Sequence, residues 1–99
     1  MSMYAVVGIW NIDPTLRDKQ DQGLHALVIP SVRNHPGFVV GYWMRDVDSG
    51  KGHTTIVLES EQSAQAFKEN VLGNSQNQAK AGITADSLAV VEIIAEAQR

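Results

Sequence analysis

Three histidines and a set of aromatic side chains are the residues of this sequence that could do chemistry. Histidine titrates near neutral pH and ligates metals, so each could serve as an acid or a base. His25 lies in a helix-like stretch, in line with Val28 and Val32, and is the candidate catalytic residue. The alternative interpretation makes His25 a half-buried helix residue with a single hydrogen bond.

The other two histidines occupy different settings. His35 precedes Pro36, which favours a turn and a capping or surface role. His53 follows Gly52 at the start of a predicted strand and could approach the mouth of a pocket, although a surface position is commoner there. The histidines lack the i, i+4 or His-x-His spacing of a metal site, so no metal ligand is predicted.

Four aromatic residues are candidates for substrate binding, together with His53. Tyr4 and Trp10 are separated by an even number of positions, so they share one face of a predicted strand. They could stack on an aromatic substrate, or simply form the hydrophobic core. Tyr42 and Trp43 are adjacent and must point to opposite faces of their strand, but the sequence does not decide which one faces the helices.

Composition excludes several classes of protein. The 99 residues correspond to one domain, and the absence of cysteine excludes disulfides, thiolate zinc sites, iron–sulfur clusters and cysteine nucleophiles. The net charge is −3 and the eight basic residues are scattered, so no nucleic-acid partner is expected. No dinucleotide or phosphate-binding motif is present, and no cofactor is predicted. The apolar stretches are too short for a membrane span and no signal peptide is recognised, which predicts a cytoplasmic protein.

Hydrophobic patterning predicts four strands and two helices. The strands cover residues 3–12, 38–45, 53–59 and 87–97. The first helix covers residues 15–33 after Asp13 and Pro14, with Pro30 expected to kink or divide it near Val28 and Ile29. Ser60 is predicted to cap the second helix, and a short extra helical turn is expected around residues 76–81.

The resulting order, β-α-β-β-α-β, predicts an α+β ferredoxin-like fold with a four-stranded antiparallel sheet and both helices on one face. Three of the four strands are apolar on both faces, yet two helices can cover only one. An uncovered apolar face of this extent predicts a homodimer that packs sheet to sheet. Glu92, in the otherwise apolar last strand, requires an edge position or an ion pair with Arg33 or Arg45.

Two segments carry a resemblance to a known family. These are HPGFVVGYWMRD at residues 35–46 and TIVLES at residues 55–60, both placed in the predicted β-α-β-β-α-β order. Over about residues 3–95 the chain resembles the antibiotic biosynthesis monooxygenase-like group of the dimeric α/β-barrel superfamily. The resemblance implies one such domain over residues 1–99, a homodimer, and a pocket between helices and sheet.

The same resemblance implies binding of an aromatic or apolar small molecule and leaves the reaction open. Cofactor-independent monooxygenation is the leading hypothesis, and an isomerase or decyclase reaction is a weaker one. The alternative is a non-catalytic binding or assembly module whose pocket is filled by its own side chains. The haem-degrading branch of the superfamily uses an Asn in strand one, a Trp at the end of strand three and a later His. This chain has Gly8 and Leu58 at about the matching positions and no histidine after His53, so membership of that branch is not expected.

Overall fold

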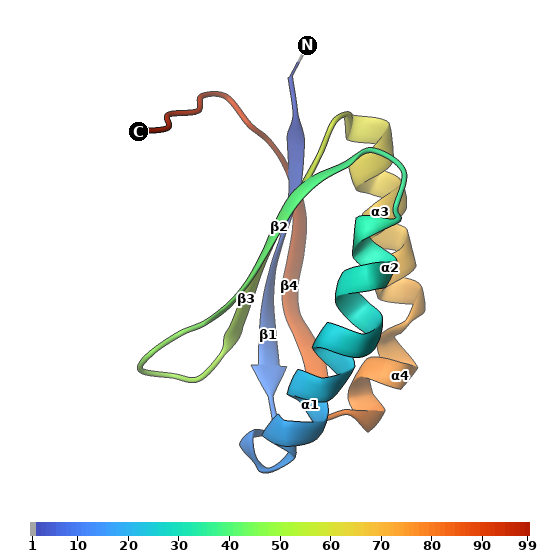
Figure 1. The fold of residues 1–99 in the computed structure, drawn as a ribbon, viewed down its shortest axis with the longest axis vertical. Coiled ribbons are helices and arrows are strands. Elements are labelled where there is room, and N and C mark those ends of the chain that lie inside the picture. The colour runs from blue at the N-terminus through green and yellow to red at the C-terminus, as the bar shows by residue number, and fades with distance from the viewer. Residues whose placement is uncertain (1) are drawn as a thin grey trace.

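The computed structural model describes residues 2–99. It has two layers, one of helices and one formed by a single β-sheet (Figure 1). The strands are β1 (Tyr4–Ile12), β2 (Phe38–Arg45), β3 (Gly52–Leu58) and β4 (Ile83–Glu92). The helical segments are η1 (Pro14–Leu16), α1 (Arg17–Gly23), η2 (Leu24–Val28), α2 (Ile29–Arg33), α3 (Glu61–Gly73) and α4 (Ser75–Lys80). The predicted element order and the short extra helix after α3 are both confirmed.

The sheet is antiparallel throughout, with the strand order β2-β3-β1-β4. This is the predicted ferredoxin-like arrangement, in which the first and third strands are central. Val6 of β1 pairs with Ile56 of β3 and with Val90 of β4, so apolar residues of three strands align on one face. The central strands are buried on that face, as their β-branched and aromatic composition requires.

The last strand differs from its predicted bounds of 87–97. It begins at Ile83, which pairs with Ile12, and ends at Glu92, which pairs with Tyr4. Because β1 is the one neighbour of β4 in the sheet, the ends of β1 set the ends of β4. A further backbone bond joins the Ile93 N–H to the Met3 carbonyl at 2.9 Å. Beyond it, residues 93–99 leave the sheet on the side opposite to the helices (Figure 1).

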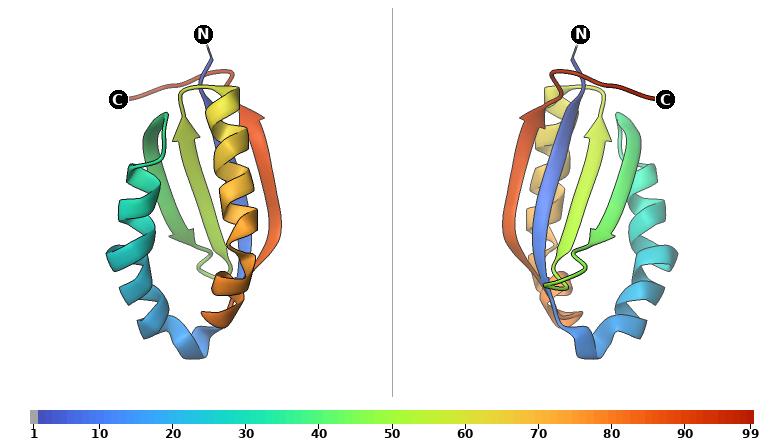
Figure 2. Two further views of the ribbon diagram at one scale, coloured as in Figure 1. Left: turned by 90° about the vertical axis from the view of Figure 1, so that its right-hand side faces the viewer. Right: turned by 90° about the vertical axis from the view of Figure 1, so that its left-hand side faces the viewer.

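The helices cover one face of the sheet unequally. Helix α3 packs against β1, β3 and β4, whereas α2 packs against β2 at the edge of the sheet (Figure 2). Ser60 caps α3 as predicted, since its hydroxyl accepts the N–H of Ser63. The core lies between α3, α2 and the sheet, and its buried members are Val6, Val32, Ile56, Leu58, Ala64 and Phe67.

The first helix changes its hydrogen bonding at the position where Pro30 was expected to act. In η2 the chain is a π-helix, and the Ile29 N–H donates to the Leu24 carbonyl, five residues back. Pro30 lacks an N–H and crowds the preceding turn, which accounts for the widened turn. The predicted apolar stripe is only partly correct: Val32 is buried, but Leu27 remains 71% exposed and Val28 is also exposed.

The opposite face of the sheet has no helix against it, and we call it the uncovered face (Figure 2). Alternation along the strands assigns apolar and small polar side chains to it. These are Ala5, Val7 and Ile9 of β1, Tyr42 and Met44 of β2, His53, Thr55 and Val57 of β3, and Ser87, Ala89 and Val91 of β4. Tyr42, Met44 and Val91 are exposed there.

Within residues 2–99, no helix has the length and apolar character needed to cross a membrane.

Candidate functional site: a groove between a helix and the sheet

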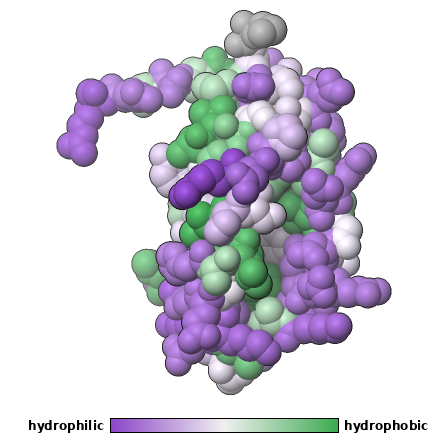
Figure 3. Space-filling view, turned by 45° about the vertical axis from the view of Figure 1, so that its right-hand side comes forward, coloured by the Kyte–Doolittle hydropathy of each residue, from purple (hydrophilic) through white to green (hydrophobic). Residues whose placement is uncertain are grey.

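A groove of about 370 Å³ runs between α2 and the edge strand β2. One wall comes from α2 and the other from β2, with lining residues Ile29, Arg33, Phe38, Val39, Val40, Gly41 and Trp43. Figure 3 shows this side of the molecule, where hydrophobic side chains lie inside a hollow with hydrophilic side chains around it. The volume lies in the range of small-molecule sites, and the lining is mostly apolar, as such sites usually are.

The groove exists because the first helical segment stands away from the sheet. No residue of η1, α1 or η2 is buried, and these segments pack mainly on one another. Of the helical segments that precede β2, only α2 joins the core, through Val32. The helix is therefore anchored at its C-terminal end and leaves apolar surface of the sheet accessible beside it.

A glycine places Trp43 in the groove. An added Cβ at Gly41 would lie 2.9 Å from Ile56 Cδ1 and 3.2 Å from the Trp43 ring, so the indole lies over this glycine. Gly41 thus lets a large aromatic ring lie close to its own strand. Trp43 packs partly on the core and presents an aromatic surface to the groove.

Trp10 is arranged in the same way on β1 but is buried. Its ring nitrogen lies 2.7 Å from the position of an added Cβ at Gly8 and donates a hydrogen bond to Thr54 Oγ1 at 3.0 Å. Only 8% of Trp10 is exposed. With its polar atom satisfied and its ring enclosed, Trp10 serves as core in this structure and does not line the groove.

Two arginines bring positive charge to the helix side of the sheet. Arg33, in the last turn of α2, lines the groove, and it takes part in no ion pair among the described residues. Arg45, at the end of β2, instead contacts Asp21 of α1 at 3.8 Å. Neither arginine pairs with Glu92, which lies at the end of the edge strand β4 and is exposed.

Tyr4 lies at the other end of the helix face and packs against the core. Its hydroxyl donates to Glu92 Oε2 at 3.5 Å. Desolvation raises the pKa of the Tyr4 phenol above its usual range, and the carboxylates of Glu92 and Glu61 raise that pKa further. Because a raised pKa disfavours the phenolate, Tyr4 is poorly suited to accept a proton from a substrate.

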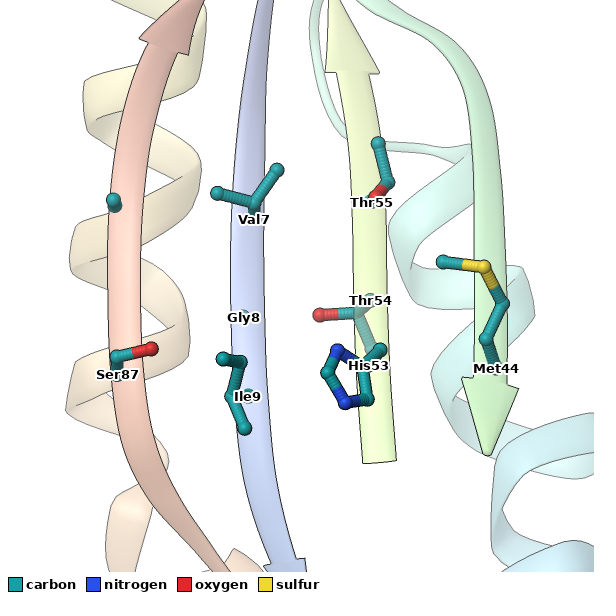
Figure 4. Close-up of a pocket in the computed structure, with 9 residues that line it drawn as sticks. Val7, Gly8, Ile9, Met44, His53, Thr54, Thr55 and Ser87 are labelled. Carbon is teal, nitrogen blue, oxygen red and sulfur yellow. The ribbon is translucent and has the colours of Figure 1, made fainter. Parts of the chain in front are cut away.

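A second hollow, of about 250 Å³, lies on the uncovered face. Figure 4 shows His53, Met44, Val7 and Ile9 pointing to the same side of the sheet, with the helices behind them. His53 is half-buried there, between Ile9 on β1 and Met44 on β2. The structure therefore places His53 on the face opposite to the groove.

The remaining predicted site residues are also separated. Tyr42 and Trp43 do point to opposite faces: Trp43 lines the groove, and Tyr42 is 56% exposed on the uncovered face. His25 is exposed in η2, one turn before Ile29, and lines neither hollow. Among residues 2–99 no three potential ligands from His, Cys, Asp and Glu lie close enough together to hold a metal ion.

Sequence reasoning missed most of the groove's lining. The sequence pattern predicts Arg33 only as an ion-pair partner of Glu92, and it gives no signal that Ile29 or Phe38 belongs to a site. A signal existed in the two Gly-x-Trp segments, Gly8 to Trp10 and Gly41 to Trp43, because a glycine two positions before a tryptophan leaves room on the same face of a strand.

No protein-family model matches the chain, and no curated protein has significant sequence similarity to it. Solved structures do match. The haem-degrader MhuD from Mycobacterium tuberculosis, solved with two haems in its active site, is 18% identical over 97% of this chain and 99% of its own, with a TM-score of 0.70. A monooxygenase of Streptomyces coelicolor, solved with nanaomycin D, is 17% identical over 99% and 90% of the two chains, with a TM-score of 0.64.

A third structure, a candidate antibiotic biosynthesis monooxygenase from Deinococcus radiodurans, is 12% identical over 97% of this chain and 95% of its own, with a TM-score of 0.68. At such identities the likeness establishes the fold alone. The chain has the fold of the antibiotic biosynthesis monooxygenase-like proteins, which confirms the fold expected from the resemblance in sequence.

Proposed function

We propose that this protein binds an aromatic or otherwise apolar small molecule in the groove between α2 and β2. The observation that carries the proposal is the groove itself: a volume of about 370 Å³ with an aromatic ring and aliphatic side chains on its walls. Two neighbours of this fold were solved with small molecules bound, one with haems and the other with nanaomycin D, which supports the proposal.

We further propose that the reaction is a cofactor-independent monooxygenation of a phenolic substrate. A general base that removes the phenol proton leaves an electron-rich phenolate, which can itself reduce O₂. One oxygen atom then replaces a ring hydrogen to give a quinone, and the other leaves as water. His25 is the proposed base: it lies outside the lining of the groove, one helical turn before Ile29, which does line it. Histidine suits this role near neutral pH.

Binding is tested by filling the groove. Ile29→Trp places a large side chain between α2 and β2, and we expect it to abolish the ligand-induced shift of the Trp43 indole N–H signal in NMR spectra. Leu27→Trp is the matched control, since Leu27 is exposed on the adjacent π-helical turn and lines neither hollow. Equal binding by both variants would place the ligand elsewhere.

Catalysis is tested by oxygen consumption with a panel of dihydroxy-aromatics. We expect His25→Ala to reduce the rate by about 10²-fold or more, the typical contribution of general-base catalysis. An undiminished rate would remove His25 from the mechanism. Binding without oxygen consumption would favour the alternative function, a non-catalytic binding or assembly module.

We also propose that the protein is a homodimer that buries the uncovered face. The support is an extended face with exposed Tyr42, Met44 and Val91, which no helix of the chain covers. Residues 93–99 leave the sheet on the same side, where a second copy packed against that face would meet them. Ile94, in this segment, is 90% exposed.

A further inference from the structure

The groove between α2 and β2 has one charged side chain in an otherwise apolar lining. Ile29, Phe38 and Trp43 provide aliphatic and aromatic surface, and Arg33 provides the single charge. A ligand that matched only the apolar walls would leave this exposed guanidinium in contact with solvent alone. The lining is therefore complementary to a molecule with an apolar body and an anionic group.

Arg33 is available for such a contact. Arg45 is held by Asp21 and Lys51 by Asp86, but Arg33 has no carboxylate within ion-pair distance among residues 2–99. Its position in the last turn of α2 suits a cation without any ligand, because the helix dipole is negative there. The interaction with the helix dipole explains why position 33 carries a positive charge, but a lysine there would make that interaction equally well.

We propose that the ligand is an aromatic or aliphatic carboxylic acid and that Arg33 is the residue that selects its carboxylate. The planar guanidinium offers two parallel N–H donors to a carboxylate, while the ring or chain of the ligand lies against Trp43 and the aliphatic wall. This inference rests on the proposed binding function of the same groove.

The test uses a pair of probes that differ only in charge, 2-naphthoate and 2-naphthalenemethanol. Affinity is measured from the shift of the Trp43 indole N–H signal, identified with Trp43→Phe, while the buried Trp10 provides an internal reference. We expect the wild-type protein to bind naphthoate about tenfold or more tightly than the alcohol, the effect of a hydrogen bond to a charged group.

Three variants test whether Arg33 causes the preference for naphthoate. Arg33→Gln should remove the preference for naphthoate, and Arg33→Lys should retain part of it, since lysine keeps the charge but not the paired donors. Arg17→Gln is the matched control, because Arg17 is exposed on α1 and lines neither hollow. Unchanged thermal melting of the Arg33 variants separates this role from stabilisation of the helix end.

The outcomes distinguish this inference from the binding function on which it rests. Equal affinity of the wild-type protein for both probes, with a Trp43 shift, overturns the role of Arg33 and leaves the groove as a binding site. A preference retained in Arg33→Gln, or lost equally in Arg17→Gln, also overturns it. If neither probe shifts the Trp43 signal, both the inference and the proposed site fail.

Discussion

At the scale of single residues, glycine decides where the two tryptophans lie. Gly8 and Gly41 each lie two positions before a tryptophan on the helix face, and each ring occupies the space that a side chain would fill. The results differ because of the neighbours. Trp10 lies on a central strand and donates a hydrogen bond to Thr54. Trp43 lies on an edge strand beside the groove.

Gly41→Ala should therefore destabilise the fold and move Trp43. The new methyl group would meet Ile56 Cδ1 at 2.9 Å and the indole at 3.2 Å, and overpacking of this kind costs about 1–3 kcal/mol. We expect this loss in the free energy of unfolding measured in urea, with a weaker ligand response of Trp43.

Gly23→Ala is the matched control for that experiment. Gly23 lies in α1, where an added Cβ has nothing within 4 Å, so alanine should stabilise the helix by about 1 kcal/mol or less. A neutral Gly41→Ala would show that Trp43 can relax without cost, and the role assigned to this glycine would be wrong.

At the scale of elements, one proline changes the helix that borders the groove. Pro30 cannot donate to the carbonyl one turn back, and the chain before it adopts the π-helical bonds of η2. Such turns are frequent at functional sites. Here the π-helix lies between α2, which joins the core, and α1, which does not.

Pro30→Ala should convert η2 to an ordinary α-helix. Alanine restores the missing N–H and removes the clash of the ring, so the bond from Ile29 to Leu24 is no longer favoured. We expect amide hydrogen exchange to slow across residues 24–30. Pro36→Ala, in the loop before β2, should leave that segment unchanged. Persistence of the π-helical pattern in Pro30→Ala would mean that packing, and not proline, causes it.

At the scale of the whole molecule, the sheet has one covered and one uncovered face. Ala5 is 3% exposed on the uncovered face, because Val57 and Val91 flank it, but the wider face still presents apolar side chains to solvent. Patches of this kind mark interaction surfaces in soluble proteins. An apolar face of this extent is what the proposed two-fold dimer would bury.

Light scattering at micromolar concentration should give about twice the monomer mass of 10.8 kDa. Met44→Lys places a charge on the uncovered face, where Met44 is 48% exposed, and should shift the protein to the monomer without unfolding it. Leu27→Lys, on the exposed π-helical turn, should leave the dimer intact. A monomeric wild-type protein would contradict the proposed assembly.

The local sequence was sufficient for the elements and their order. The continuous apolar run of residues 38–45, the cap at Ser60 and the proline at position 30 all act over a few residues, so their effects were predictable. The bounds of β4 were not predictable from local sequence, because they depend on which residues of β1 remain available for pairing.

The candidate site required the tertiary structure. Adjacent positions told us that Tyr42 and Trp43 face opposite ways, but the register with β3 decided that Trp43 faces the helices. Likewise, the helical pattern of residues 15–33 predicted an apolar stripe, yet only Val32 is buried, because the helix meets the sheet at one end. The sequence by itself therefore determined the elements, and packing between distant segments decided where a groove remains and that Arg33 lines it.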